Sequence, residues 1–338
     1  MQRTGERTGL RYVDGEQIEA ALAEHRGHVL GCIGFGEPAP AFDPGSVPFA
    51  HAGMPVVGAN PACELWLSPE PVRNVRRGAL SSARNGEVLF GCLAIPANDS
   101  VDYDTLIYDE YCPIFDHLDE LGYPNLLRVW HYLPDIHREE HAMERYKRFS
   151  LGRHEAFIAR GRAISADAPA ASAVGKRSGN TVIGFLAAPR PGIPIENPRQ
   201  VSAYSYPAQY GPRGPTFSRA LFTLWGQLPQ LYISGTAAIF GHHSQHEGDA
   251  DAQAAETIVN LRSVMDEART QGLIEIGQST EMLFKVYLRE PAFHAVAQAR
   301  LLEAFGPAPT IIYLQADICR RELLLEIEVV CTNRAAFA

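Results

Sequence analysis

The chain has 338 residues, of which 46% are hydrophobic and 20% charged, a composition typical of a globular protein with a substantial core. No stretch approaches the roughly 18 consecutive apolar residues of a membrane span, and the polar residues 1–8 lack the apolar segment of a secretory signal, so we expect a cytoplasmic protein without membrane contact. The net charge of −9 and the dispersed lysines and arginines argue against a nucleic-acid partner.

The first predicted elements follow an irregular segment. Residues 36–62 are rich in proline and glycine and predict a segment that wraps the surface. After it, residues 87–95 predict a strand, 103–121 a helix that ends at Gly122, and 126–133 a second strand. Together these elements predict a β-α-β unit.

The same β-α-β order recurs in the second half of the chain, where one more helix and two more strands follow it. The predicted elements there are the strands 228–239, 282–288, 310–317 and 323–331 and the helices 251–271 and 291–305. Residues 283–329 thereby repeat the plan of residues 126–188, which indicates that one supersecondary unit was used at least twice. A pseudo-symmetric protein has internal interfaces where a ligand can bind.

A long connection between the two copies is a candidate ligand-contacting segment. Residues 190–215 are dense in proline and glycine, and they also carry Tyr204, Tyr210, Arg199 and Arg213. Linkers are usually polar and poor in aromatic residues, so a mere linker is disfavoured. A packed structural loop remains the alternative to a ligand-contacting one.

The six cysteines and the glycines predict neither a disulfide framework nor a cofactor site. No C-x-x-C spacing occurs, so we expect reduced and mostly buried thiols. The glycines near residue 34 do not form G-x-G-x-x-G, so no dinucleotide is indicated, and we expect no cofactor.

Short motifs in the second half of the chain resemble the RidA/YjgF fold. They lie, in order, at residues 210–213, 217–220, 231–237, 253–261 and 326–329. The resemblance implies a sheet backed by two helices, three such domains packed around an axis, and active sites between them. We therefore expect an α/β (α+β) chain of two such domains, 1–145 and 146–338, which form a pseudo-oligomer within a monomer. The second domain would carry most of the active site, and residues 1–85 have no assigned role.

Longer motifs resemble the chorismatase family. They lie at residues 152–161, 164–166, 169–175, 196–204 and 234–239, and the similarity extends over about residues 85–331. The resemblance implies an enzyme that removes the enolpyruvyl side chain of chorismate as pyruvate. RidA-type deaminases need an arginine at the start of the strand near residue 309, and none is present, so deamination is disfavoured.

Glu326 matches the carboxylate that the chorismatase resemblance implies is catalytic. Its apolar neighbours predict a buried strand, and Glu328 faces the same side of that strand. Burial and a neighbouring carboxylate both favour the protonated acid that cleavage of an enol ether needs. An edge-strand glutamate that points to water is the alternative.

Chorismate carries two carboxylates, and the planar guanidinium of arginine suits them. We expect Arg213, Arg153 and Arg219, in that order, to bind them, with Tyr204 and Tyr210 as orienting hydroxyls. For any one arginine, a surface ion pair is the alternative.

The resemblance also implies that Cys319 selects the product. Cysteine at this position implies hydroxybenzoate, whereas a small and inert residue implies hydrolysis to 3,4-dihydroxycyclohexa-1,5-diene carboxylate. We therefore expect attack of a ring hydroxyl and formation of 3-hydroxybenzoate. Ala237 or Ala238 would shape the pocket where glycine would fit the 3-hydroxybenzoate pattern better, so 4-hydroxybenzoate or a mixture stays open.

The sequence also contains features that suggest other kinds of function than chorismate cleavage. The run from His137 to His141 has the H-x-x-E-H spacing of a zinc metallopeptidase, but its surroundings are hydrophilic. His242, His246 and Asp249 lie in a connecting loop, where a hydrogen bond from His242 or His246 to the substrate is favoured over a metal. We expect no metal site. A RidA-like binding protein without activity is disfavoured because it would not need Glu326 and Cys319.

Overall fold

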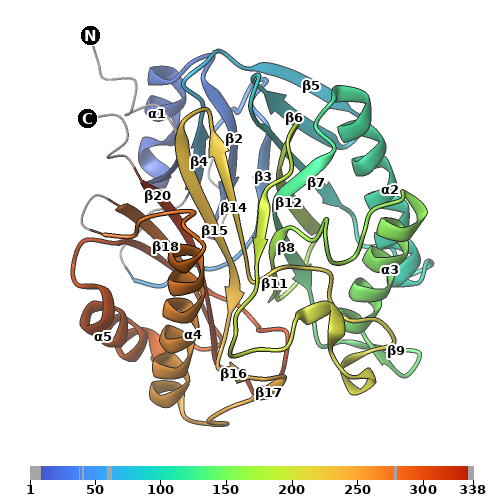
Figure 1. Cartoon of the computed structure of the whole chain (residues 1–338). Coiled ribbons are helices and arrows are strands. Elements are labelled where there is room, and N and C mark those ends of the chain that lie inside the picture. Colours follow the sequence, from blue (N-terminus) through green and yellow to red (C-terminus); the bar gives the residue numbers. More distant parts are fainter. Residues whose placement is uncertain (1–8, 38, 40–41, 59–62, 278–279, 334–338) are drawn as a thin grey trace.

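Three mixed sheets form the framework of the protein, with helices on their outer faces (Figure 1). The computed structural model describes residues 9–333 apart from 38, 40–41, 59–62 and 278–279. The first sheet has the strand order β1 (Gly9–Val13), β4 (Cys63–Leu67), β2 (Val29–Gly34) and β3 (Phe49–His51), with α1 (Ile18–Glu24) between β1 and β2.

The other two sheets have six strands each. The second sheet has the order β11 (Ala170–Lys176), β8 (Asn125–Pro134), β12 (Thr181–Ala188), β7 (Leu89–Ile95), β6 (Leu80–Arg84) and β5 (Arg73–Arg77), with α2 (Tyr103–Leu121) and α3 (Arg145–Ala159). The third has the order β13 (Ile193–Ile195), β14 (Ala220–Trp225), β15 (Leu228–Thr236), β20 (Leu325–Asn333), β18 (Thr280–Leu288) and β19 (Thr310–Gln315), with α4 (Ala250–Thr270) and α5 (His294–Phe305).

The two six-stranded sheets have the same connectivity. In each, the strand that is second from one edge (β8 or β18) pairs in parallel with the edge strand that follows the second helix (β11 or β19). On its other side, β8 or β18 pairs antiparallel with the last strand of the copy (β12 or β20). That last strand also pairs antiparallel with the strand of the same sheet that precedes the first helix (β7 or β15). The predicted internal repeat and the α/β (α+β) class are therefore confirmed.

The first sheet is a smaller third copy of this arrangement. Strand β2 pairs in parallel with β3 and antiparallel with β4, and β4 also pairs antiparallel with β1. Residues 35–48 connect β2 to β3, at the place where α3 and α5 stand in the larger copies. The sequence predicted two copies, because the proline-rich segment hides the helical spacing that marks the other two.

Strand pairing also bears on the division into domains. Strands β11 and β12 follow residue 145 in the sequence, yet they pair with β8 and β7 in the second sheet. This pairing favours a division after Ala188 over the predicted one between residues 145 and 146.

A central hydrophobic core lies between the three sheets. It joins Leu30 and Trp66 of the first sheet to Trp130 of the second and Tyr232 of the third, all fully buried. The ring centroid of Trp66 lies 5.4 Å from that of Trp130 and 6.3 Å from that of Tyr232. Such aromatic pairs add about 0.5–1.5 kcal/mol each beyond the burial of their area. Strands β8 and β18 are buried on both faces because helices cover the face opposite this core.

Several local predictions agree with the structure within a few residues. The predicted helices 103–121 and 251–271 are α2 and α4. Helix α4 begins after Asp249, whose side chain accepts a hydrogen bond of 3.0 Å from the Ala252 amide, and α2 ends at Gly122, which has a φ of 79°. The predicted strand 228–239 is shorter: β15 ends at Thr236, and β16 (Ile239–Phe240) forms a separate hairpin with β17 (His243–Ser244).

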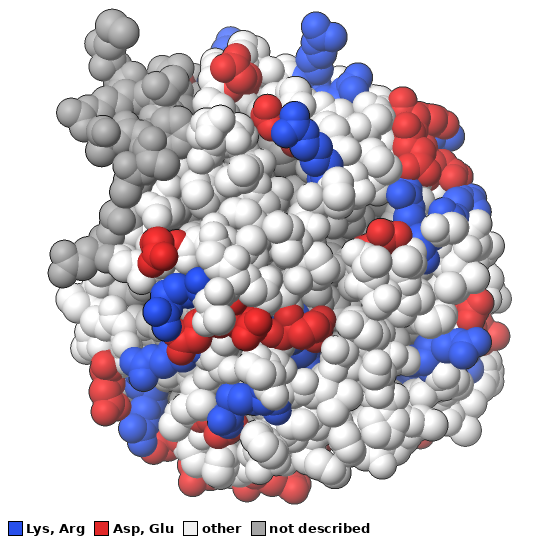
Figure 2. Space-filling model, in the orientation of Figure 1, with Lys and Arg blue, Asp and Glu red and all other residues white. Residues whose placement is uncertain are grey.

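On the face shown in Figure 2, acidic and basic side chains are interspersed between larger uncharged areas. None of the helices in the described part of the chain is both long and apolar enough to cross a membrane.

Candidate active site

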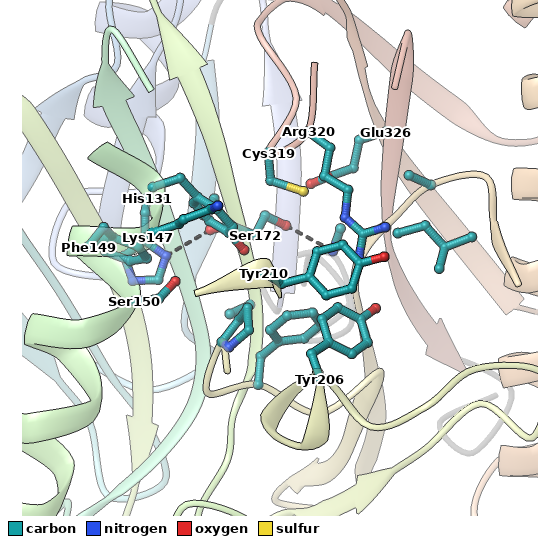
Figure 3. A pocket seen from close by; sticks show the side chains of 18 of the residues that line it. His131, Lys147, Phe149, Ser150, Ser172, Tyr206, Tyr210, Cys319, Arg320 and Glu326 are labelled. Carbon is teal, nitrogen blue, oxygen red and sulfur yellow. Dashed lines mark hydrogen bonds between the residues drawn. The ribbon is translucent and has the colours of Figure 1, made fainter. Parts of the chain in front are cut away.

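A cavity of about 270 Å³ lies where the second and third sheets meet (Figure 3). Strand β11 approaches β15 there, and the amide of Ala171 donates a hydrogen bond of 2.9 Å to Ser234 Oγ. Helix α3 and the loop that holds the short turns η3 (Ala203–Ser205) and η4 (Ala208–Tyr210) complete the wall. The residues that line the cavity include His131, Tyr146, Arg153, Ser172, Tyr206, Tyr210, Arg219, Gly235, Ala237, Cys319, Arg320 and Glu326.

Glu326 on β20 lies at the cavity wall and is only 4% exposed. Burial, and next the nearby carboxylate of Glu328, raise the pKa of Glu326 to about 8, while Arg128 and Arg219 oppose this more weakly. In about nine-tenths of the molecules, Glu326 is then protonated at pH 7. The cavity therefore holds a carboxylic acid that can donate a proton.

Gly235 leaves the space that the Glu326 carboxyl occupies. A Cβ atom added to Gly235 would lie 1.9 Å from Glu326 Oε1, so the carboxyl would have to move from its place. The Gly235 amide donates a hydrogen bond of 3.1 Å to Ser172 Oγ on the opposite sheet. Glycine at this position thus lets the acid approach the seam between the two sheets.

Glu328, two residues along the same strand, has the opposite protonation state. Burial by itself would raise its pKa, but the charges of Lys285 and Arg128 outweigh burial and lower the pKa of Glu328 to about 2. The two glutamates face the same side of β20, so an ionised carboxylate stands beside a protonated one.

Three arginines at the cavity wall each keep one buried nitrogen atom without a hydrogen-bond partner among the described residues. These atoms are Arg153 Nη2, Arg219 Nε and Arg320 Nη2. A buried cationic N–H group without a partner is unfavourable, and a carboxylate is the ligand that best satisfies it.

The other nitrogen atoms of these arginines are held by the protein. Arg153 Nε donates to Tyr111 Oη at 2.8 Å, and Arg153 Nη1 donates to the Thr216 carbonyl. Arg219 Nη2 donates to the Val201 carbonyl and to Tyr206 Oη, both at 2.7 Å.

Arg320 is fixed in a similar way. Its Nη1 donates to the His242 carbonyl at 2.9 Å and to Ser244 Oγ at 3.0 Å. Its guanidinium also lies 4.0 Å from the ring centroid of Tyr210. The orientation of all three guanidinium groups is therefore set before any ligand binds.

Cys319 lies beside the acid. In Figure 3 its sulfur and the carboxyl of Glu326 point toward one another. Burial, and next the charge of Glu326, raise the pKa of the Cys319 thiol to about 12. The side chain is therefore a neutral thiol at physiological pH and a poor nucleophile.

His131 on β8 forms part of the cavity floor. Its Nδ1 donates to the Ser172 carbonyl at 2.8 Å, so the neutral ring accepts the Tyr111 hydroxyl at Nε2. Burial, and next the charge of Arg153, lower the pKa of His131 well below its ordinary range. A neutral imidazole in this position links the second sheet to Arg153 through Tyr111.

Comparisons with known proteins agree with this geometry. A family model described as chorismatase FkbO/Hyg5-like, N-terminal, matches residues 64–187. A 3-hydroxybenzoate synthase from Streptomyces hygroscopicus is 33% identical over 312 residues, which cover 89% of this chain and 91% of that protein. The chain belongs to the chorismatase family.

Two further relatives cover most of the chain. A chorismatase from Streptomyces rapamycinicus is 33% identical over 277 residues, which cover 78% of this chain and 80% of that protein. The crystal structure of a chorismatase is 28% identical with a TM-score of 0.84, and the match covers 95% of this chain and 97% of that one. The similarity therefore includes the first sheet as well as the other two.

For this chorismatase family member, the structure brings together most of the residues that the sequence singled out. Glu326, Cys319, Arg153, Arg219 and Ala237 all line the cavity. Tyr210 lines it as well, but its hydroxyl donates to the His242 carbonyl at 2.7 Å, and its ring packs against Arg320.

Three predicted residues lie elsewhere. Arg213 is exposed, with its Nε 3.5 Å from Glu155 Oε1, and it does not line the cavity. Tyr204 is half-buried outside the lining, and Ala238 is buried in the central core. Arg320 occupies the kind of position that the sequence assigned to Arg213.

Sequence reasoning did not propose a role in the site for several of the lining residues named above. These are His131, Tyr146, Ser172, Gly235 and Arg320. Arg320 directly follows Cys319, and Gly235 lies in the run that contains Ala237, so both had a local signal. His131 and Ser172 come from strands whose apolar pattern indicates only burial.

The histidine motifs have other roles. Residues 137–141 lie at the hairpin of β9 (Glu139–Glu140) and β10 (Met143–Glu144) instead of on a helix, so His137 and His141 do not share a helical face. His242 contributes its carbonyl to Tyr210 and Arg320 and does not line the cavity. Within the described ranges, no three His, Cys, Asp or Glu side chains are grouped so that they could hold a metal ion.

Proposed function

We propose that the protein is a chorismatase that protonates the enolpyruvyl group of chorismate and releases pyruvate, with 3-hydroxybenzoate as the second product. One observation carries the proposal: a buried, protonated Glu326 shares a cavity with three guanidinium groups that each present an N–H without a partner among the described residues. Chorismate offers two carboxylates and an enol ether, and the cavity offers a complement to both.

The acid does the first chemical step. An enol ether is cleaved when its terminal carbon takes up a proton, because the side chain then becomes an oxocarbenium ion that an oxygen nucleophile can trap. Glu326 holds a proton at neutral pH and lies at the cavity wall, which are the two requirements for a general acid. The ionised Glu328 nearby makes the loss of that proton unfavourable until a substrate accepts it.

Arg153, Arg219 and Arg320 supply the carboxylate-binding groups in this proposal. Arg320 takes the place that the sequence suggested for Arg213, because the latter lies outside the cavity. Since hydrogen bonds to carbonyls and tyrosines already hold all three guanidinium groups, little orientation entropy is lost when the ligand binds. Tyr206 and Tyr210 support Arg219 and Arg320, respectively.

Two features favour 3-hydroxybenzoate. The S. hygroscopicus relative, 33% identical, bears the name 3-hydroxybenzoate synthase. Cys319 places a neutral thiol beside the acid, where a water molecule would otherwise fit, so a ring hydroxyl traps the activated side chain. The bond between that hydroxyl oxygen and the ring then breaks as the ring loses a proton and becomes aromatic, and the oxygen leaves with pyruvate. The lost ring proton balances the proton that Glu326 delivers, and no water is consumed overall.

Hydrolysis to 3,4-dihydroxycyclohexa-1,5-diene carboxylate is the second candidate. Relatives named only chorismatase, without a stated product, are also 33% identical. Ala237 narrows the cavity by one methyl group compared with glycine, which keeps 4-hydroxybenzoate among the products to be tested.

The test is to incubate the purified protein with chorismate in water labelled with oxygen-18. Pyruvate is measured with lactate dehydrogenase, and the ring product is identified by chromatography and mass spectrometry. 3-Hydroxybenzoate together with unlabelled pyruvate, trapped at once as lactate, supports the proposal. The dihydroxycyclohexadiene acid together with labelled pyruvate supports hydrolysis, because water attacks the side-chain carbon and the ring keeps its own oxygen. Absence of pyruvate would favour a binding protein over an enzyme.

We also propose that the protein acts as a monomer, because the three sheets that share a central core all come from one chain. Light scattering during size-exclusion chromatography should then give a mass near 37.1 kDa. A multiple of this mass would refute the proposal. The cytoplasmic location stays a prediction from the sequence.

A further inference from the structure

A cluster of four charged side chains is buried where the three sheets meet. Glu64 comes from β4 of the first sheet, Arg128 from β8 of the second, and Lys285 and Glu328 from β18 and β20 of the third. Each is at most 4% exposed. Lys285 Nζ lies 2.6 Å from Glu64 Oε2 and 2.9 Å from Glu328 Oε1, and Arg128 Nη2 lies 2.7 Å from Glu328 Oε2.

Hydrogen bonds saturate the Glu328 carboxylate. Its Oε1 accepts from Lys285 and from Trp130 Nε1 at 2.8 Å, and its Oε2 accepts from Arg128, Ser172 Oγ and Tyr287 Oη. With five donors from both large sheets, Glu328 is ionised and cannot move toward the cavity. It therefore acts as a fixed negative charge beside Glu326.

The cluster is electrically neutral only while Glu326 keeps its proton. Two cations, Arg128 and Lys285, face two anions, Glu64 and Glu328, and these four charges cancel. An ionised Glu326 would add a third carboxylate to two cations that are already paired. Buried charge without compensation is strongly unfavourable.

Other titratable or charged groups also face Glu326 from the elements around it. They are Glu328 on its own strand, Tyr287 on β18, Arg128 on β8, Tyr146 on α3, Arg219 before β14 and Cys319 before β20. Both tyrosines and the cysteine are neutral at physiological pH because burial raises their pKa values. The balance of charge is therefore decided by the arginines, Lys285 and the glutamates.

We propose that Glu64 and Lys285 are positioning residues for the acid, through which the first sheet sets the protonation state of Glu326. Neither residue lines the cavity. Glu64 neutralises one of the two cations, Lys285, so the four-residue cluster keeps Glu328 ionised but carries no net positive charge that would favour ionisation of Glu326. The inference assigns a role to the N-terminal part of the chain, and it rests on the proposed function for its rate measurement.

The test is the pH dependence of pyruvate release by the full-length protein with the substitution Glu64→Gln. Glutamine keeps an acceptor for Lys285 but removes one negative charge, so the cluster gains a net charge of +1. Removal of a buried unit charge from such a cluster, at an effective dielectric constant of about 20, changes the pKa of a neighbouring carboxyl by about one unit. The alkaline limb of the rate profile should move to lower pH by at least about one unit.

Two matched variants separate this role from a merely structural one. Glu64→Asp keeps the charge and should leave the alkaline limb in place. The double variant with Glu64→Gln and Lys285→Gln restores neutrality and should return the limb to the wild-type position. A structural role would lower the rate or the yield of folded protein in all of these variants without moving the limb.

An unmoved limb in folded Glu64→Gln protein overturns the proposal. If this variant does not fold, Lys285→Met decides the question, because removal of a cation should move the limb to higher pH, and an unmoved or lower limb overturns the proposal. If the wild type releases no pyruvate, the proposed function fails. The same variants are then compared by infrared titration of Glu326, in which a Glu326→Gln spectrum is subtracted, and the same shifts are expected.

Discussion

The free energy of unfolding of the Glu326→Gln variant, compared with that of the wild type at the same pH, should increase from acidic to neutral pH. Glutamine keeps the shape of the side chain but cannot ionise. In the wild type, the pKa of Glu326 is about 8 in the folded protein, against an ordinary value of 4.5. Between these values the folded protein binds a proton that the unfolded chain releases, so the free energy of unfolding decreases as the pH rises.

The magnitude follows from the two pKa values. Each pH unit within this window changes the free energy of unfolding by about 1.4 kcal/mol, so the difference of 8 − 4.5 corresponds to about 5 kcal/mol. The contribution is fully present below pH 4.5 and is lost by pH 8. Between pH 5.5 and pH 7.5, the stability of the Glu326→Gln variant relative to wild type should increase by about 3 kcal/mol.

Urea unfolding at pH 5.5, 6.5 and 7.5 measures this difference. The buried Trp66, Trp130 and Trp225 provide a fluorescence signal in the central core. Glu247→Gln, at an exposed glutamate, is the matched control, and its difference from wild type should not change with pH. If the Glu326→Gln and wild-type stabilities run parallel across this range, Glu326 is ionised in the folded protein and the reasoning is refuted.

Four further predictions concern turnover of chorismate. The rate of pyruvate release should fall about tenfold per pH unit above about 8, because ionised Glu326 has no proton to deliver, and a constant rate to pH 10 would contradict this. Arg219→Met should raise KM at least about tenfold through loss of a charge-assisted hydrogen bond, whereas exposed Arg213→Met should not; equal effects would argue against the proposed binding groups. Gly235→Ala should abolish activity in a folded protein, as judged by circular dichroism, because its Cβ would lie 1.9 Å from the acid, and retained activity would place the acid elsewhere. Cys319→Ala should admit water and add dihydroxycyclohexadiene acid, formed together with oxygen-18-labelled pyruvate, and an unchanged product would remove the thiol from product selection.

Local sequence patterns were sufficient for the repeated units. The 3.6-residue spacing of α4 and its boundaries at Asp249 and Gly272 are encoded within the segment itself. The apolar neighbours of Glu326 predicted its burial, and the resemblance to the chorismatase family distinguished it from Glu328 in the same strand. The third copy was missed because a proline-rich connection lies between β2 and β3, where the other two copies have the helix that made them visible.

The arrangement of the cavity depended on contacts between distant segments. Nothing local in the sequence shows that Arg320 lines the cavity and that Arg213 does not. Arg320 reaches the cavity because the segment after Cys319 packs against the loop that carries Tyr210. Glu64 also lies in an apolar strand, but nothing nearby in the sequence indicates its partner Lys285, which lies 221 positions away in the chain. Such pairings are set by how the sheets meet, which no local periodicity reports.

The most direct test of the account is the rate at which Glu326→Gln protein consumes chorismate, measured by pyruvate release with binding measured in parallel by calorimetry. Because the carboxylic acid is the proton donor, the rate should fall by at least about 100-fold while the dissociation constant for chorismate stays close to that of the wild type. A variant that binds chorismate and releases pyruvate at nearly the wild-type rate would show that another group delivers the proton, and it would contradict the central claim.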